Sequence, residues 1–306
     1  RKAGFQRLPG CGYRQGSLGF PMHPRTLISA PELAASLDDP GLRIVDCRFD
    51  LADEQAGARA YEELHIRGAV YAHLHNDLAA PITQQTGRHP LPDPERFAAT
   101  LGRWGIDNDS QVVVYDGGPG AMAARLWWML RWLGHDKVAV LDGGFAGWQQ
   151  HGGSTISGVS HYPATVFQSH EQPGITLDAD QVQQGLAANE LLLIDVRARP
   201  RYRGETEPLD KVAGHIPGAI NLPFEKNLDA QGAFLPRETL AEQYRELMDA
   251  NPGKQPCFMC GSGVTACHGL LAMEVAGIHG ARLYPGSWSE WITDPNRAVA
   301  VGDSPD

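Results

Sequence analysis

Residues 256–276 read PCFMCGSGVTACHGLLAMEVA: a short apolar stretch, a turn of small residues, and a second apolar stretch. The segment Pro256 to Met259 is typical of a buried strand, and Val264 to Ala276 is typical of a helix. Cys260 to Gly263 form the turn between them. A strand that feeds a helix through a tight turn is the repeating unit of α/β proteins with parallel sheets.

An earlier part of the chain has the same order of features, which indicates an internal repeat. Val112 to Tyr115 predict a buried strand, Asp116 to Gly120 a glycine-rich turn, and Ala123 to Leu133 a helix. Both copies end on a glycine–aromatic signature. Its closing tryptophan follows the start of the turn by 32 positions in the first copy (Trp148) and by 31 in the second (Trp291). The first helix is apolar on almost every side, so we expect it to be buried between its sheet and the partner domain.

The features upstream of the turns are duplicated as well. Each copy begins with a capping-box pattern, at residues 29–32 and 178–181. An aspartate at the end of a short apolar strand follows 17 residues later, with an arginine two positions beyond it and then a histidine that we expect to brace its loop. We expect the aspartates and arginines to form structural ion pairs; these residues are Asp46, Arg48 and His65 in the first copy and Asp195, Arg197 and His215 in the second. Five features in one order, at nearly equal spacing, predict two α/β domains in tandem, each a mainly parallel sheet flanked by helices.

The length of 306 residues also favours two domains. The repeat predicts an N-terminal domain at residues 25–150 and a C-terminal domain at residues 175–306, joined by a polar linker at residues 151–174. Residues 1–24 contain arginines but no acidic residue, and their glycines and prolines leave no amphipathic helix. We expect them to be a disordered or cloning-derived leader, with the natural protein starting near Met22.

Composition argues against several classes of function. The formal net charge of −10 disfavours a nucleic-acid binder, and no run of about 18 apolar residues suggests a membrane-spanning helix. Five cysteines are too few and too unevenly spaced for a disulfide scaffold. We therefore expect a reducing, cytoplasmic setting, in which a clustered cysteine indicates metal binding or catalysis.

The two turns differ where chemistry would take place, because the first begins with an aspartate and the second with Cys260. A strand, a glycine-containing loop and a helix start direct several backbone N–H groups toward one point, which makes an anion-binding site. With a cysteine at its start, the anion would be the thiolate or the persulfide formed from it. Gly261 and Gly263 fit because glycine readily adopts positive φ. The hydroxyl of Ser262 or Thr265 would add a hydrogen bond.

The order of these motifs resembles the two-domain rhodanese superfamily over roughly residues 26 to 292. The matching segments are I-V-D-x-R at residues 44–48, H-I-P-G-A at residues 215–219, C-G-S-G-V-T-A at residues 260–266 and G-S-W-x-E-W at residues 286–291. The resemblance implies a catalytically silent first domain and a nucleophile in the second. The loop is most similar to the 3-mercaptopyruvate sulfurtransferase branch, since thiosulfate:cyanide sulfurtransferases tend to place basic residues directly after the cysteine.

By the same resemblance, Cys260 is the sulfur acceptor and Ser262 is the loop hydroxyl of a relay that Asp77 and His89 of the first domain complete. Arg201 matches the family arginine that binds the donor carboxylate. A second arginine of the family has no counterpart here, because the stretch Glu205 to Lys211 is about two residues shorter, and Lys211 is the candidate to replace it. The remaining expected substrate-binding residues belong to the loop: Gly261, Gly263, Val264 and Thr265.

The implied reaction moves sulfane sulfur from a small donor to Cys260 and then to an acceptor. The expected donor is 3-mercaptopyruvate, with thiosulfate as the alternative, and the expected acceptor is a thiol such as thioredoxin, or cyanide. The scheme needs no metal and no organic cofactor, and neither a nucleic acid nor a membrane is expected as a partner.

Three other interpretations stay open. A Cys-based phosphatase would use C-x5-R, but the sixth residue after Cys260 is alanine. A zinc site could draw on Cys257, Cys260, Cys267 and His268, although a strong site needs a second similarly spaced pair. Cys257 and Cys267 could otherwise resolve an oxidised Cys260 or simply pack. A noncatalytic interaction module would be expected to have lost the second cysteine as it lost the first.

Overall fold

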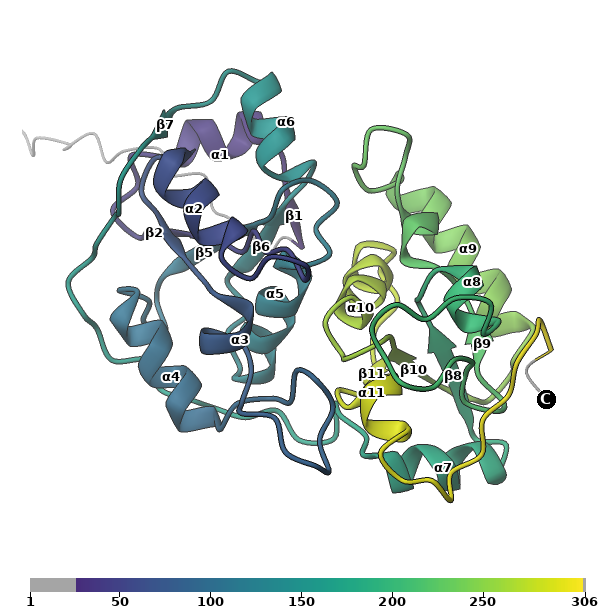
Figure 1. Cartoon of the computed structure of the whole chain (residues 1–306). Helices are drawn as coiled ribbons and strands as arrows, with labels where there is room; N and C mark the ends of the chain where they lie inside the picture. Colours follow the sequence, from purple (N-terminus) through teal and green to yellow (C-terminus); the bar gives the residue numbers. More distant parts are fainter. Residues whose placement is uncertain (1–25, 305–306) are drawn as a thin grey trace, which may run out of the picture.

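The computed structural model describes residues 26–304, so the expected leader, with Cys11, lies outside the described residues. Two α/β units lie side by side, each built on a parallel sheet with helices on both faces (Figure 1). The predicted fold class is therefore confirmed. Among residues 26–304, no helix combines the length and apolar character that crossing a bilayer requires.

The N-terminal unit contains a five-stranded parallel sheet and six helices. The strands are β1 (Leu27–Ile28), β2 (Leu42–Asp46), β4 (Ala69–Tyr71), β5 (Gln111–Tyr115) and β6 (Val138–Leu141). The helices are α1 (Ala30–Ser36), α2 (Ala56–Glu63), α3 (Leu74–Asp77), α4 (Pro94–Arg103), α5 (Ala123–Trp132) and α6 (Gly144–Gln150).

The C-terminal unit contains a four-stranded parallel sheet with its own helices. The strands are β8 (Leu191–Asp195), β9 (Ile220–Asn221), β10 (Gln255–Met259) and β11 (Arg282–Leu283). The helices are α7 (Ala179–Ala187), α8 (Arg199–Tyr202), the 3-10 helix η1 (Phe224–Asn227), α9 (Arg237–Asp249), α10 (Ala266–Val275) and α11 (Ser287–Trp291).

The two sheets have the same strand order, which confirms the repeat at the level of topology. The order is β1-β6-β5-β2-β4 in the first sheet and β11-β10-β8-β9 in the second. A parallel bridge from Thr176 to Leu283 occupies the place of β1 in the second sheet. Since all strands are parallel, the loops after β5 and β10 leave their sheets at equivalent edges.

The repeated local motifs form the contacts that the sequence predicts. Both capping boxes are present, at the N-termini of α1 and α7. Arg48 pairs with Asp46 at 2.6 Å, and Arg197 pairs with Asp195 at 2.7 Å. Both loop histidines bond through Nδ1 to a backbone carbonyl, His65 to that of Tyr61 and His215 to that of Tyr202.

One hydrophobic core runs through both units. Alternate residues of β5 face opposite sides: Val112 and Val114 join this shared core, while Val113 packs under α1 and α6. The shared core also contains the apolar faces of α5 and α10, which pack against each other between the two sheets (Figure 1). The prediction that the first apolar helix is buried against the partner domain is confirmed. The second helix begins at Ala266, two residues later than predicted, which leaves Val264 and Thr265 in the loop.

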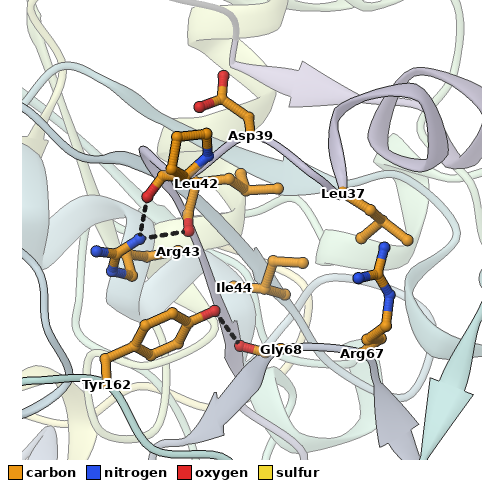
Figure 2. A pocket seen from close by; sticks show the side chains of 9 residues that line it. Leu37, Asp39, Leu42, Arg43, Ile44, Arg67, Gly68 and Tyr162 are labelled. Carbon is orange, nitrogen blue, oxygen red and sulfur yellow. Dashed lines mark hydrogen bonds between the residues drawn. The ribbon is translucent and has the colours of Figure 1, made fainter.

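The segment predicted as a linker packs on the N-terminal unit. Its strand β7 (Thr155–Ile156) pairs antiparallel with β3 (His65–Ile66). Tyr162 donates to the carbonyl of Gly68 at 2.8 Å, and the guanidinium of Arg43 lies 4.3 Å from the centre of its ring. These residues line a pocket of about 140 Å³ that contains none of the predicted site residues (Figure 2). The domain boundaries at residues 150 and 175 stay a prediction.

His268 of α10 connects the two units. Its Nε2 lies 2.9 Å from the carbonyl of Pro119, in the loop after β5, and its Nδ1 lies 3.3 Å from the side-chain nitrogen of Asn227. A neutral ring that donates from Nε2 and accepts at Nδ1 satisfies both contacts. Burial lowers the pKa of His268 to about 4.

We expect His268 to make stability fall in mild acid. Between pH 6.5 and about 4, the unfolded chain binds a proton at this residue and the folded chain does not, so the free energy of unfolding decreases as the pH falls. One such group contributes a slope of at most about 1.4 kcal/mol per pH unit. Urea unfolding across this window should show a shallower pH dependence for His268→Gln than for the parent. Parallel curves for the two proteins would contradict the assignment.

Candidate active site

Cys260 directly follows β10 and begins a loop, Cys260–Thr265, which we call the sulfur loop. Its Sγ atom accepts hydrogen bonds from the backbone N–H of Ser262 at 3.4 Å and of Gly263 at 3.2 Å. The amides therefore turn toward the sulfur, as the sequence predicts. Such an arrangement stabilises a negative charge on sulfur.

The carbonyls of the sulfur loop are fixed on its opposite side. Cys260 and Gly261 accept through their carbonyls from the amides of Trp288 at 3.0 Å and Ser289 at 2.9 Å, in the first turn of α11. The carbonyl of Gly263 accepts from Arg125 Nη1 at 3.0 Å. Because these partners hold the carbonyls outward, the intervening amides face the sulfur.

Ser287 also supports the sulfur loop, although it is not among the predicted site residues. It has φ of +53°, which is uncommon for a residue other than glycine. Its hydroxyl accepts from the amide of Cys260 at 3.1 Å and donates to the carbonyl of Tyr284 at 2.9 Å. The equivalent residue of the first copy is Gly144, with φ of +55°. A serine at a position where the other copy has glycine was the available sequence signal.

Only one of the two loop glycines adopts the positive φ that the sequence analysis predicts for both. Gly263 has φ of +76°, and a Cβ there would lie 2.2 Å from the carbonyl oxygen of Pro285. Gly261 does not adopt positive φ, contrary to expectation. A Cβ at Gly261 would lie 2.9 Å from Arg88 Nη2 and 3.4 Å from Arg201 Nη2, so both guanidinium groups lie close to its backbone.

The loop of the N-terminal unit shows what such a loop binds. The carboxylate of Asp116 accepts four backbone hydrogen bonds at 2.8 to 3.2 Å, from the amides of Gly118, Gly120, Met122 and Ala123. Its backbone carbonyl accepts from the amide of Phe145, as that of Cys260 does from Trp288. One copy of the repeat thus holds a carboxyl group among its amides, and the other holds a sulfur atom.

A chain of side chains leads from the sulfur loop to the surface. His89 Nδ1 lies 2.7 Å from the hydroxyl of Ser262, and His89 Nε2 lies 2.9 Å from His75 Nε2. His75 in turn lies 3.3 Å from the exposed carboxylate of Glu54. Burial, and then the positive charge of Arg125, lowers the pKa of His89 to about 3. His89 is therefore neutral near pH 7, and its two nitrogens can donate on one side and accept on the other.

Asp77 takes a different place from the one that the resemblance implies. Its carboxylate accepts from the backbone amide of His73 at 2.8 Å and lies 3.9 Å from Arg103. Burial raises the pKa of Asp77, although that amide opposes the shift. Within the described contacts, His75 and not Asp77 meets the far nitrogen of His89. A role for Asp77 in the relay stays a prediction that these contacts do not support.

Arg201 lies at the sulfur loop within a network of buried ion pairs. It pairs with Glu207 at 2.7 Å and with Asp210 at 3.4 Å. Arg88 of the N-terminal unit, which sequence analysis missed, pairs with the same Asp210. Burial alone would raise the pKa of Glu207, but the hydrogen bond from Arg201 and backbone amides hold it below its ordinary value.

The other predicted substrate-binding residues make no described contact that indicates a role toward a substrate. Lys211 is exposed, and among the described contacts none joins it to the sulfur loop. Val264 is buried in the shared core, and Thr265 accepts through its carbonyl from the amide of His268. Their roles toward a substrate stay predictions.

Within the part of the chain that the structure describes, Cys257 and Cys267 do not form a metal-binding cluster with Cys260. Cys257 packs in the core on one face of the second sheet, whereas Cys267 packs in the shared core on the other. Burial raises the pKa of both thiols, that of Cys267 to about 12. Within residues 26–304, no three histidine, cysteine or acidic side chains gather closely enough to hold a metal ion.

Comparisons with known proteins agree with this geometry. The family model for the rhodanese-like domain matches twice, at residues 29–151 and 178–294. A probable 3-mercaptopyruvate sulfurtransferase of Pseudomonas aeruginosa is 50% identical over 284 residues, which is 92% of this chain and 100% of that protein. The thiosulfate/3-mercaptopyruvate sulfurtransferase 2 of Arabidopsis thaliana is 36% identical, over 91% of this chain and 87% of its own length.

A solved structure gives the same result. The 3-mercaptopyruvate sulfurtransferase from Leishmania major superimposes with a TM-score of 0.76 at 30% sequence identity, over 89% of this chain and 75% of that one. In sequence, in topology and in its paired loops, the chain belongs to the rhodanese family, among the two-domain sulfurtransferases of the 3-mercaptopyruvate/thiosulfate type.

Proposed function

We propose that the protein transfers sulfur through a persulfide on Cys260. The observation that carries this proposal is the pair of amides, from Ser262 and Gly263, that point at the Cys260 sulfur. A thiolate held there attacks the sulfur of the donor, so that an S–S bond forms and the donor's C–S bond breaks. The bonding electrons of that C–S bond leave with the donor carbon.

The donor that suits this site is 3-mercaptopyruvate, with thiosulfate as the second candidate. The sulfur loop offers no cation of its own to a dianionic donor, because Gly261 and Ser262 follow the cysteine. Arg201 at the loop supplies a guanidinium that can orient a carboxylate. The names of the relatives cover both donors, so the preference rests on these residues.

The pyruvate enolate that leaves must take up a proton, and the chain from Ser262 to His75 can deliver it. His89 resists becoming charged because its pKa is about 3. A neutral histidine can still pass a proton by releasing one from Nδ1 to Ser262 while it receives one from His75 at Nε2. The outward end of this chain, at His75 and Glu54, is open to solvent.

The persulfide then gives its outer sulfur to an acceptor. A thiolate such as that of thioredoxin, or cyanide, attacks the outer sulfur, and Cys260 leaves again as a thiolate. The cycle is a double displacement that proceeds without a metal or an organic cofactor. A reducing compartment such as the cytoplasm would keep the nucleophile free between turnovers.

The first test is the intact mass of the protein after incubation with donor. We expect the parent to gain the mass of one sulfur atom, faster with 3-mercaptopyruvate than with thiosulfate. Cys260→Ser should gain none and lose transfer to cyanide by at least about a thousandfold, because the nucleophile is gone. Cys267→Ser is the matched control and should load normally.

Loading of Cys260→Ser would exclude this cysteine as the acceptor, and an unloaded parent would exclude the persulfide. Faster loading with thiosulfate than with 3-mercaptopyruvate would keep the reaction but overturn the choice of donor. A Cys-based phosphatase would gain no sulfur from either donor.

The second test separates His75 from Asp77 in the proton relay. We expect His75→Ala to lower kcat with 3-mercaptopyruvate by about tenfold, because proton delivery is interrupted, and added imidazole to restore part of the rate. Asp77→Asn keeps an oxygen that can accept from the amide of His73 and should stay within about twofold of the parent. A large loss in Asp77→Asn with none in His75→Ala would assign the relay to Asp77 instead.

A further inference from the structure

Two arginines from different units meet above the sulfur loop. The loop between α3 and α4 extends from the N-terminal unit toward α11 (Figure 1). It is fixed there, since the amide of Arg88 donates to the hydroxyl of Ser289 at 3.0 Å and Gly87 lies directly against the carbonyl of Gly286. The guanidinium of Arg88 thereby approaches Gly261 as closely as that of Arg201 does.

Asp210 lies between the two guanidinium groups. One of its carboxylate oxygens accepts from Arg88 and the other from Arg201, at 3.4 Å, and its side chain is only 4% exposed. Neighbouring Glu207 is held differently, because it also accepts from Arg197 and from the backbone amides of Leu209 and Asp210. Within the described contacts, the carboxylate of Asp210 is held by the two arginines alone.

The two arginines and Asp210 lie directly beside the sulfur loop. Cys260 is only 2% exposed, and the two guanidinium groups lie beside Gly261, the next residue of the loop. In 3-mercaptopyruvate two carbon atoms separate the sulfur from the carboxylate carbon. A donor whose sulfur meets Cys260 therefore has its carboxylate within reach of the guanidinium groups that lie at Gly261 and hold Asp210.

We propose that Arg88 and Arg201 together bind the carboxylate of the sulfur donor, and that Asp210 occupies this anion site until the donor displaces it. This inference rests on the proposed function and adds a donor-binding residue from the N-terminal unit. Arg88 fills the role that the sequence assigned to Lys211. Asp210 acts as an internal competitor that keeps the arginines paired while no donor is bound.

The exchange is electrostatically balanced. The donor brings one carboxylate to the arginines as Asp210 leaves, so neither guanidinium is left buried without a counter-charge. Asp210 can move outward because its segment forms neither helix nor strand, and its neighbours Leu209 and Lys211 are exposed. Glycines with positive φ, Gly204 and Gly214, flank that segment.

The test uses two alkylating reagents that differ in one group and do not require sulfur transfer. 3-Bromopyruvate and bromoacetone have the same bromoketone, but the first carries a carboxylate where the second carries a methyl group. Each forms an S–C bond with the Cys260 thiolate as bromide leaves. The quantity measured is the second-order rate constant of Cys260 with 3-bromopyruvate divided by that with bromoacetone. Both rates are determined on the full chain by peptide mass spectrometry.

We expect Arg88→Gln to lower this ratio by about tenfold and Asp210→Asn to raise it by a similar factor, the range for a hydrogen bond to a charged group. Arg88→Lys should recover part of the ratio. The KM for 3-mercaptopyruvate should rise in Arg88→Gln and fall in Asp210→Asn. Arg199→Gln and Asp303→Asn are matched controls, because this exposed ion pair of the C-terminal unit carries the same charges and lies outside the sulfur loop.

If Arg88→Gln has the same ratio as Arg199→Gln, Arg88 does not bind the carboxylate of the reagent. A ratio in Asp210→Asn that does not exceed the parent's would show that Asp210 does not compete. If Cys260 of the parent reacts with neither reagent, it is not the nucleophile, and the inference fails together with the proposed function. If the parent is alkylated at Cys260 but gains no sulfur from a donor, the proposed function is wrong. The ratio of the two alkylation rates still tests the anion site in that case.

Discussion

The site depends on two backbone amides that point at one sulfur atom. Cys260 lies in a buried, apolar part of the molecule, where an anion would otherwise be strongly disfavoured. The amides of Ser262 and Gly263 offset this cost, and they face the sulfur because α11 and Arg125 hold the loop carbonyls on the other side. The positive φ of Gly263 and Ser287 follows from the same requirement.

The N-terminal unit has Asp116 where the C-terminal unit has Cys260, but it supplies several residues around the sulfur loop. His89 and Arg88 come from one of its loops, and Arg125 comes from its buried helix α5. Arg125 is fully buried, and its described hydrogen bonds go to the carbonyls of Leu78, His89 and Gly263. Burial lowers its pKa, and the nearby thiols of Cys267 and Cys260 oppose that shift. A buried positive charge of the N-terminal unit therefore lies close to the sulfur of the proposed nucleophile.

Sequence reasoning was sufficient for what local patterns encode. Capping boxes, aspartate–arginine pairs and the two turns predicted two α/β units with parallel sheets and placed Cys260 at the start of a loop, because each pattern depends on residues close in the chain. The residues that it missed depend on contacts between distant segments. Arg88 contacts Asp210 of the other unit, and His75 contacts His89 across a loop. No spacing rule connects either residue to Cys260. Gly261 shows the same limit, since its close neighbours are arginines 173 and 60 positions away.

The most direct test of the amide–sulfur interaction is the rate at which neutral iodoacetamide alkylates Cys260 at pH 7. Gly263→Ala forces the loop to shift, because the new Cβ would meet the carbonyl of Pro285. Gly120→Ala introduces similar backbone strain in the loop that holds Asp116 and is the matched control. The amide–sulfur interaction predicts that the rate falls by at least about tenfold in Gly263→Ala and stays within about twofold of the parent in Gly120→Ala. Equal rates in all three folded proteins would contradict it.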